Sequence, residues 1–475
     1  MLHFKLKFEY QTKIQRGKSV KKKIIIILAA VIIPIVMLLI VSAIPKSLIS
    51  DNVKKTGQTE KTNYLYIIDG CFGTKQDNYA DYISVNIAYN IDSSDLVKSV
   101  LKSGYYDTGK QSQYYNLRDL TTQDKKSNTD YIRYWHGYEI FLRPLLIITD
   151  LDGARFIYGA LTIAITALLI AMIIRRKNLP LAVCYLLGLI SIDFWMITTT
   201  IEYTSVFLIS AACSIILLKY DDKRYKDDGF LGVIFICSGI LTAFFDFLTT
   251  ETLAFTVPYF IITAMRAKDG RLGDYRKCKD GTVKFDCSKK WMAIKTVKCG
   301  IGFVAGYAGM FLLKWLLAAA AFGMSAFTDS IKHAAIRMES GITAQLYSEK
   351  ITSGMRIYGD IWENLGCLFH FRNKINSSAA MLTFAVLLIV TFAVIYLFRE
   401  DGKNVKNGCQ GALYEKEGTV YMILAAIPFI RFLIVSNHSY MHFFFTFRAL
   451  LIFTMFIFYY TYLCTHKRIR KIFAR

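Results

Sequence analysis

The sequence predicts an all-α protein, a polytopic bundle of about ten transmembrane helices. Of its 475 residues, 54% are apolar, and they cluster in long uncharged blocks. A helix needs roughly 20 apolar residues to cross a hydrocarbon core of about 30 Å, and most of these blocks approach that length. Lys and Arg gather in alternate segments between the blocks. This pattern excludes a soluble globular protein, a disordered chain and a small disulfide scaffold.

The predicted elements follow one another in a simple order. A basic segment, 1–23, precedes the first span, 24–44, which is longer than the usual core of a signal peptide and is therefore interpreted as uncleaved. A large first extracytoplasmic loop with interfacial helices follows over 45–153, and transmembrane helices 2–7 lie within 154–320. A second extracytoplasmic segment covers 321–378, and helices 8–10 lie within 379–464. The chain ends in a basic cytoplasmic tail, 465–475. The individual later spans are predicted near 154–174, 179–198, 201–218, 230–248, 252–265, 299–320, 379–398, 419–435 and 447–464.

The basic residues predict the orientation. With the N-terminus in the cytoplasm, the inner segments hold 35 of the 58 Lys and Arg residues. Positive charge favours the cytoplasmic side, so both termini are predicted to lie inside and the two long loops outside. Orientation and anionic membrane lipid account for the net charge of +22, and no nucleic-acid partner is needed. The sequence gives no indication of the oligomeric state.

Charged residues within the predicted spans lie on one side of the membrane. In this topology they fall in the outer half of the spans or at their outer boundary, at Asp193, Glu202, Asp246, Glu251, Lys314, Arg431 and Arg448. Charges in a membrane are costly and are candidates for function by default. Snorkelling can account for a long side chain such as Lys314, but poorly for aspartate. We therefore predict a polar site at the outer leaflet, with Asp246 and Glu251 as candidates that face a substrate.

Two aspartates lie at the start of an amphipathic stretch in the first loop. An apolar residue recurs at every fourth position, at Tyr79, Ile83, Ile87 and Ile91. This spacing predicts a helix, and Asp77 and Asp81, also four apart, share its other face. Such a pair can supply a general base or a metal ligand. The alternatives are a solvated polar face and a helix cap formed by Asp77.

A second amphipathic stretch of the loop runs over 133–144. If it is helical, its aromatic and apolar face consists of Tyr134, Tyr138, Phe141 and Leu145. Arg133, His136 and Arg143 fall on the opposite face. Aromatic residues beside arginine are typical of a helix that lies in the membrane interface. Two interpretations stay open, an aromatic anchor and a helix that faces the substrate.

The last predicted outer turn, 436–442, gathers cationic residues. Arg431 precedes it by about one helical turn, and Arg448 follows it by six residues. Guanidinium groups bind phosphate oxygens with paired hydrogen bonds, so this group is predicted to bind phosphate; its members are Arg431, His438, His442 and Arg448. The two histidines can also ligate a metal, although no third ligand is near in the sequence. Pairing with acidic residues of neighbouring spans is the alternative.

These features together resemble the GT-C class of bacterial integral-membrane glycosyltransferases. Members of this class take sugars from polyprenyl-phosphate or polyprenyl-diphosphate donors at the outer face of the membrane. The likeness covers most of the chain: a cytoplasmic N-terminus, a first span, a large outer loop with two interfacial helices, and an Arg/His group near the last spans. By this resemblance, Asp77 or Asp81 is the catalytic carboxylate, 133–145 is the second interfacial helix, and 437–448 holds the carrier phosphate. The family's acidic residue usually follows the first span closely, whereas Asp77 lies more than thirty residues beyond Pro45.

The resemblance implies an enzyme that transfers a sugar from a polyprenyl-phosphate donor to an acceptor hydroxyl during cell-envelope glycan assembly. The loop aspartate would deprotonate the acceptor in a single inverting displacement. A divalent metal cofactor stays open, since many relatives use one and some do not. Two interpretations from other classes also stay open. One is a lipid or solute transporter or flippase that uses the same charges as a gate, and the other is a non-catalytic scaffold of a polysaccharide assembly complex.

Overall fold

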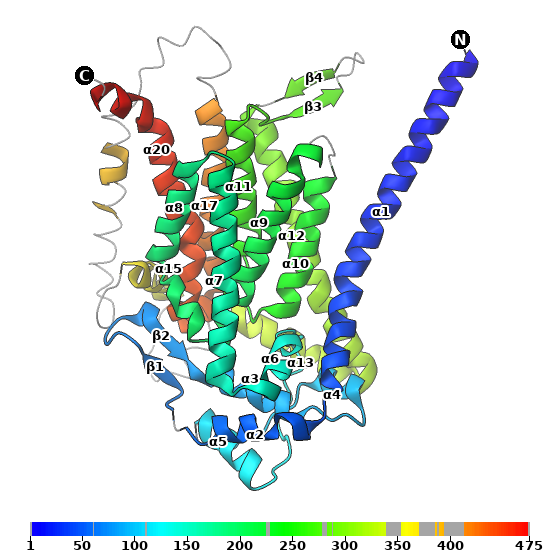
Figure 1. Cartoon of the computed structure of the whole chain (residues 1–475), viewed down its shortest axis with the longest axis vertical. Helices are drawn as coiled ribbons and strands as arrows, with labels where there is room; N and C mark the ends of the chain where they lie inside the picture. The colour runs from blue at the N-terminus through cyan, green and yellow to red at the C-terminus, as the bar shows by residue number, and fades with distance from the viewer. Residues whose placement is uncertain are drawn as a thin grey trace.

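The computed structural model describes residues 2–59, 61–109, 112–224, 229–277, 283–286, 288–338, 353–369, 385–386, 389–393 and 413–473. Over these ranges the chain forms eighteen α-helices and two short antiparallel strand pairs, β1 with β2 and β3 with β4. The prediction of an all-α protein is therefore confirmed. The strand pairs are local hairpins at the ends of a helical bundle (Figure 1).

Six helical segments are long and apolar enough to cross a membrane: Val20–Ser42, Leu151–Arg175, Ile201–Asp222, Lys289–Phe322, Glu417–Ile434 and Phe443–His466. They belong to α1 (Leu2–Ser42), α7 (Leu151–Arg175), α9 (Ser205–Arg224), α12 (Lys289–Phe322), α17 (Leu413–Ile434) and α20 (Leu451–Phe473). Three further predicted spans contain shorter helices, which are α8 (Leu179–Ser191), α10 (Phe230–Phe245) and α11 (Leu253–Lys268). The predicted span 379–398 lies mostly outside the described residues. A membrane protein is thus supported, while the number of spans is not fixed at ten.

The helices of the bundle start where the sequence supplies caps. Asp150 accepts a hydrogen bond from Gly153 N at 3.1 Å at the start of α7, and Asn178 accepts one from Leu181 N at 3.3 Å at the start of α8. Such side chains satisfy backbone donors that lack a partner within the helix. Helix α9 packs against α7, α10 and α11, and α17 packs against α11, α12 and α20. One large apolar core lies between α8, α9, α11, α17 and α20.

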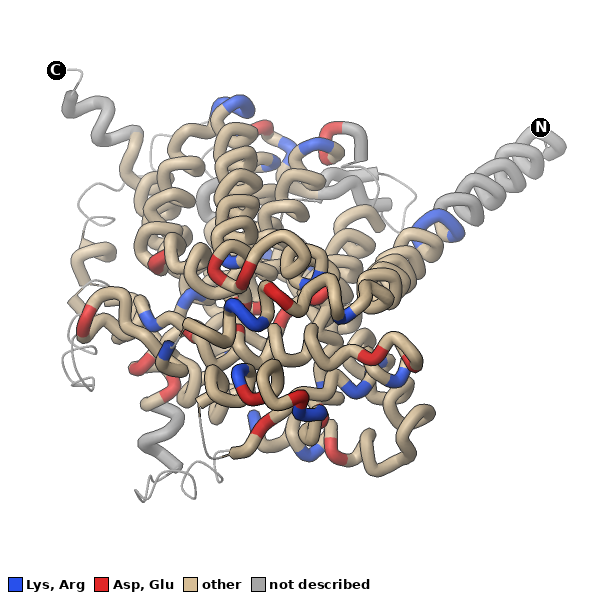
Figure 2. Tube along the Cα trace, turned by 60° about the horizontal axis from the view of Figure 1, so that its bottom comes forward, with Lys and Arg blue, Asp and Glu red and all other residues tan. Residues whose placement is uncertain are grey.

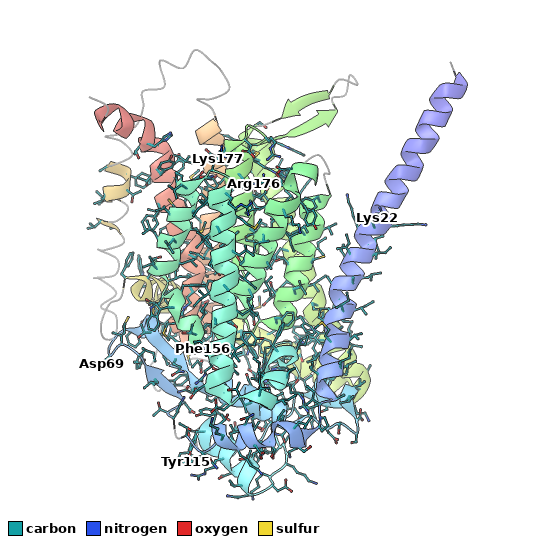
Figure 3. All side chains as sticks on the ribbon, viewed as in Figure 1. Lys22, Asp69, Tyr115, Phe156, Arg176 and Lys177 are labelled. Atoms are coloured by element: carbon teal, nitrogen blue, oxygen red, sulfur yellow. The ribbon has the colours of Figure 1, made fainter. Side chains whose placement is uncertain are left out.

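The bundle has two distinct ends (Figure 1). Both chain termini lie at one end, here called the terminal end, together with β3 (Asp274–Lys277) and β4 (Val283–Asp286). Arg176 and Lys177 lie at this end in Figure 3, whereas Asp69 and Tyr115 lie at the opposite end. The opposite end, here called the loop end, carries the segments between α1 and α7, together with α13 (Met324–Met338). An arrangement with both termini inside requires both ends of the chain on one side of the bundle; the sidedness itself stays a prediction.

The first loop folds into a compact unit on the loop end. Its helices are α2 (Lys46–Thr56), α3 (Asn78–Asn90), α4 (Leu96–Lys102), α5 (Gln113–Thr122) and α6 (Glu139–Ile148). Buried apolar side chains join α2, α3, α5 and α6 to the start of α7, among them Val53, Val85, Leu117 and Leu142. The strands β1 (Tyr64–Tyr66) and β2 (Lys75–Asp77) pair antiparallel, with Tyr64 opposite Asp77. This pairing fixes Asp77 directly in front of α3.

Two local predictions for this loop have different outcomes. Helix α3 confirms the helical stripe, because Ile83 and Ile87 are both buried. The helix predicted over 133–144 is wrong in its first half, because α6 begins only at Glu139. His136 adopts a left-handed backbone conformation with φ of 54°, which a helix cannot contain. The aromatic spacing of this stretch arises from side-chain packing and not from helical periodicity.

Helix α1 leans away from the bundle (Figure 1). Only 11% of its most apolar stretch is buried, and Ile25 and Ile40 are each more than 60% exposed. Apolar surface of this kind is stable against lipid but not against water. Its end is held by Arg143 of α6, which donates hydrogen bonds to the carbonyl oxygens of Val41 and Ile44.

Candidate active site

Charged side chains that are buried at the loop end come from segments far apart in the sequence. Figure 2 turns this end toward the viewer and shows acidic and basic residues side by side over it. Those that are less than 10% exposed are Asp77, Asp81, Glu139, Arg143, Arg155, Asp193, Glu202, Asp246, Glu251, Lys314, Asp360, Arg431 and Arg448. They come from the first loop, from the segments that join α8 to α9 and α10 to α11, and from the neighbouring helices. Asp77, Asp81 and Asp246 each lie close enough to Glu202 to act on its charge.

Asp77 occupies the junction between the first loop and the bundle. Its Oδ1 accepts a hydrogen bond from Ala80 N at 3.0 Å and caps α3, as one of the open interpretations expected. Its own backbone N–H donates to Thr200 Oγ1 at 3.3 Å. The pKa of Asp77 is raised to about 7, mainly by burial; the charge of Asp81 also raises it, while the hydrogen bond from Ala80 and the charge of Lys75 lower it. A carboxylate with this pKa can accept a proton near neutral pH.

Asp81 has a structural role in this geometry. The side chain is fully buried, and its Oδ2 accepts a hydrogen bond from Arg155 Nε at 2.8 Å. Its carboxylate also accepts from Ile201 N at 3.2 Å. The same arginine donates to Asn78 Oδ1 at 2.8 Å. Asp81 therefore joins α3 to α7 and to the segment before α9. The alternative of a solvated polar face is wrong, because both aspartates are buried.

Glu202 is a residue that sequence reasoning noted without assigning to the site. It lies in a 3-10 turn, Ile201–Tyr203, just before α9. Gln76 Nε2 donates to Thr199 O at 2.7 Å, so this segment is fixed beside Asp77. Glu202 Oε2 is buried and has no hydrogen-bond partner among the described residues. In the sequence, Glu202 is recognisable only as an acidic residue next to an apolar block. Nothing in the local sequence links it to Asp77.

Arg431 is fully engaged by neighbours. Its Nε lies 2.9 Å from Glu251 Oε1, and its other nitrogens donate to Ser439 Oγ at 2.9 Å and Leu248 O at 2.8 Å. This matches the alternative in which the arginine pairs with an acidic residue of a neighbouring segment. Asp246 lies in the same region and accepts a hydrogen bond from Thr249 N at 2.9 Å.

His438 and His442 lie against each other, with ring centroids 4.6 Å apart. Burial and nearby positive charge lower the pKa of both rings, to about 3 for His442, so both are neutral at pH 7. A neutral imidazole lacks the charge that a phosphate ligand of this kind would use. No group of three His, Cys, Asp or Glu side chains placed to hold a metal occurs within the described residues. In the part of the chain that the structure describes, the histidines therefore lack the partners that a metal site needs.

Arg448 connects the first loop to the bundle. Its Nη2 donates to Gly73 O at 2.8 Å, and its guanidinium lies 4.4 Å from the ring centroid of Tyr203. The side chain is 1% exposed. Lys75 lies nearby, with its Nζ 3.8 Å from the ring of Tyr64 and 3.9 Å from that of Phe444. Among the predicted phosphate ligands, Arg431 and Arg448 thus have other partners in place.

The candidates from the second amphipathic stretch separate in space. Arg143 is fully buried and its guanidinium donates to Ala88 O as well as to the end of α1. His136 is 3% exposed, and its ring nitrogens lie 3.1 Å from Tyr138 Oη and from Tyr131 O. These contacts give both residues a role in packing the loop. Arg133 differs, since it is only partly buried and lines a pocket together with Arg337.

Lys314 is the basic residue for which snorkelling was considered. Instead, its Nζ donates to Val100 O at 3.0 Å and to Leu101 O at 2.9 Å, near the end of α4. An ammonium group at a helix C-terminus satisfies carbonyl groups that lack a partner within the helix. Lys314 therefore joins α12 to the first loop.

Comparisons of the chain with protein-family models, with characterised proteins and with solved structures found no match. The function is therefore inferred from the geometry of the site.

Proposed function

We propose that this chain is an integral-membrane glycosyltransferase of the GT-C type, which moves a sugar from a polyprenyl-phosphate donor to an acceptor hydroxyl. The observation that carries the proposal is Asp77, a buried carboxylate with a pKa of about 7, located where the first loop meets the bundle. Perturbed carboxylates of this kind concentrate at catalytic sites. Cell-envelope glycan assembly is the process that fits a membrane enzyme with a lipid-linked donor.

The proposed topology places the loop end outside the cell and the terminal end in the cytoplasm. The segments predicted to be cytoplasmic hold 35 of the 58 Lys and Arg residues, which supports this orientation. At the terminal end, Arg266 Nε donates to Asp221 Oδ1 at 2.9 Å, and the buried Glu417 accepts a hydrogen bond from the Tyr421 hydroxyl at 3.0 Å. The groups available for chemistry therefore lie at the loop end. Ten spans remain part of the proposal and include 379–398.

In the proposed mechanism, Asp77 deprotonates the acceptor hydroxyl as its oxygen attacks the anomeric carbon of the sugar. The bond from that carbon to the donor phosphate breaks, and the phosphate leaves with its electron pair. Basic side chains stabilise the charge that develops on it. Asp81, the neighbouring carboxylate on α3, helps to keep the pKa of Asp77 high. Because one displacement suffices, no covalent enzyme intermediate is required.

The arrangement of the carboxylates bears on whether this mechanism uses a metal ion. The described carboxylates are not arranged as a group of three that could hold a cation, so the mechanism assigns no step to a metal. Lys75 lies between two aromatic rings and close to Asp77, and it supplies positive charge to the site without a metal ion.

The test is sugar transfer from a radiolabelled polyprenyl-phosphate sugar by the purified protein in detergent. Asp77→Asn should lose at least roughly a hundredfold in rate, because a positioned general base contributes about that much. Asp92→Asn is a matched control, since Asp92 lies in the same loop but is exposed. Equal rates for Asp77→Asn and Asp92→Asn would refute the assignment of the base. If neither the wild-type protein nor the variants transfer any sugar over a panel of sugars and acceptors, the proposed activity is refuted.

A further inference from the structure

A second feature of the loop end is a pocket of about 330 Å³ between α12 and α13. Its wall is mostly apolar and includes Ala308, Phe311 and Trp315 of α12 and Ala334 and Met338 of α13. Helix α12 is a candidate membrane span, and only 28% of its apolar stretch is buried within the protein. The pocket therefore borders the region that lipid chains occupy.

Two arginines line this pocket, Arg133 and Arg337. The Nε atoms of both are buried and have no hydrogen-bond partner among the described residues. Neither guanidinium lies within ion-pair distance of a carboxylate in the part of the chain that the structure describes. Arg337 Nη1 donates to His333 O at 3.1 Å, and each guanidinium lies near an aromatic ring, Arg133 at 4.2 Å from Tyr131 and Arg337 at 5.3 Å from Tyr134.

The other buried arginines have polar partners of two kinds. Arg155, Arg266 and Arg431 each have an acidic partner within 3 Å, whereas Arg143 and Arg448 donate to backbone carbonyl oxygens. Two partly buried guanidinium groups that share a pocket without an anion repel each other and lose hydration. Both act on the same neighbour, since the charges of Arg133 and Arg337 both lower the pKa of His333 in addition to the effect of its burial. An anion bound between them would relieve this repulsion and satisfy their donors.

The pocket also lies within electrostatic range of the candidate active site. Tyr307, one of its lining residues, lies within electrostatic range of Asp246, Glu251 and Arg431. Arg133 acts on Tyr79, which follows Asp77 by two residues. An anion held by Arg133 and Arg337 would therefore lie between the membrane side of α12 and the loop that carries Asp77.

We propose that this pocket binds a phosphorylated lipid, with the phosphate on Arg133 and Arg337 and the start of the hydrocarbon chain along Phe311 and Trp315. The apolar wall favours a lipid over free phosphate, because it gives the chain a surface to pack against. Identifying that lipid as the sugar donor or its spent carrier rests on the proposed function. The site itself differs from the cluster at 431–448 that the resemblance implied.

The direct test is equilibrium binding of farnesyl phosphate to the purified full chain, with farnesol and inorganic phosphate as comparison ligands. Farnesyl phosphate should bind saturably, and each comparison ligand should bind at least roughly tenfold more weakly, since each lacks one half of the interaction. Arg133→Gln and Arg337→Gln should each weaken binding by roughly tenfold or more. Lys332→Gln, which removes an exposed charge from α13 without touching the pocket wall, should leave it unchanged.

A second pair of variants tests the apolar wall without changing any charge. Ala334→Phe fills the pocket and should weaken farnesyl phosphate binding at least roughly tenfold. Ala305→Phe adds the same ring to an exposed position of α12 outside the pocket and should bind normally. Normal binding by both arginine variants and Ala334→Phe would overturn the site. So would inorganic phosphate that competes as well as farnesyl phosphate.

The binding result and the transfer result can fail separately. Binding that follows these predictions, in a protein that transfers no sugar, keeps the lipid site and rejects the proposed enzyme. Sugar transfer that needs Asp77 but is unaffected by Arg133→Gln and Arg337→Gln keeps the enzyme and rejects the lipid site.

Discussion

At the scale of the residue, Asp77 illustrates how burial prepares a carboxylate for proton transfer. Its pKa of about 7 means that it is protonated below neutral pH and cannot then act as a base. We expect kcat/KM to rise with pH through an apparent pKa near 7 and to level off above it. A pH–rate profile of the wild-type protein measures this directly. A flat profile from about pH 5 to about pH 9 would contradict the role of a buried base.

The same pKa shift has a consequence for stability. A carboxyl whose pKa is higher in the folded state costs folding free energy once the unfolded chain can ionise, so stability falls as pH rises from about 4 toward 7. Asparagine cannot ionise and can still cap α3. Asp77→Asn is therefore expected to match or exceed the wild type in melting temperature at pH 8 while losing activity. A lower melting temperature would mean that the lost activity reflects misfolding.

Asp81 leads to the opposite expectation. Because it neutralises the buried Arg155, Asp81→Asn leaves that charge without its main partner and should destabilise the protein by about 3 kcal/mol or more. The double variant Asp81→Asn/Arg155→Met removes both charges and should recover part of this loss. Thermal unfolding in detergent measures both effects. A double variant less stable than Asp81→Asn would show that Arg155 acts mainly through its other contacts.

At the scale of the element, the close packing of α10 on α12 depends on glycine. A Cβ atom added to Gly239 would lie 2.1 Å from Phe303 O, and one added to Gly306 would lie 2.2 Å from Ile236 O. Small residues let two membrane helices approach closely. Gly306→Val should therefore separate the helices and cost about 1–3 kcal/mol of stability. Gly309→Val is the matched control on the same helix, because nothing lies within 4 Å of an added Cβ there. Equal melting temperatures for the two variants would contradict the close contact.

The elements also show which features the sequence could predict. Helix α3 was predictable because its apolar residues repeat every four positions and all four lie in one local segment. The segment before α6 was not, because its aromatic rings pack on residues such as Phe247, more than 100 positions away, while His136 takes a left-handed backbone conformation. The pairing of Arg431 with Glu251 bridges 180 positions, so spacing alone could not separate a phosphate ligand from an ion pair. Arg337 lies in a segment whose sequence carries no recognisable motif, and only the fold places it beside Arg133.

At the scale of the whole molecule, the separation of the two ends allows a test of orientation. We expect a cysteine introduced at the exposed position Lys98, at the loop end, to react with a membrane-impermeant maleimide in intact cells. A cysteine in place of Lys177, at the terminal end, should react only after the membrane is opened. The reverse pattern would invert the topology and place Asp77 in the cytoplasm, away from a donor presented outside.

The distribution of charge also bears on the alternative interpretations. A transporter needs polar groups along a path through the bundle. Within the described ranges, the buried charged groups of the terminal end have local partners, Arg266 with Asp221 and Glu417 with the Tyr421 hydroxyl. The carboxylates that act on one another lie at the loop end. A catalyst at one face explains this separation better than a pathway from face to face.

The most direct measurement is sugar transfer from a polyprenyl-phosphate sugar by purified wild-type protein and Asp77→Asn, prepared side by side and checked for equal melting temperature. The account predicts a labelled product with the wild type and at least roughly a hundredfold less with the variant. Product formed at the same rate by both proteins would contradict the assignment of Asp77, and with it the central claim that this carboxylate makes the loop end an active site.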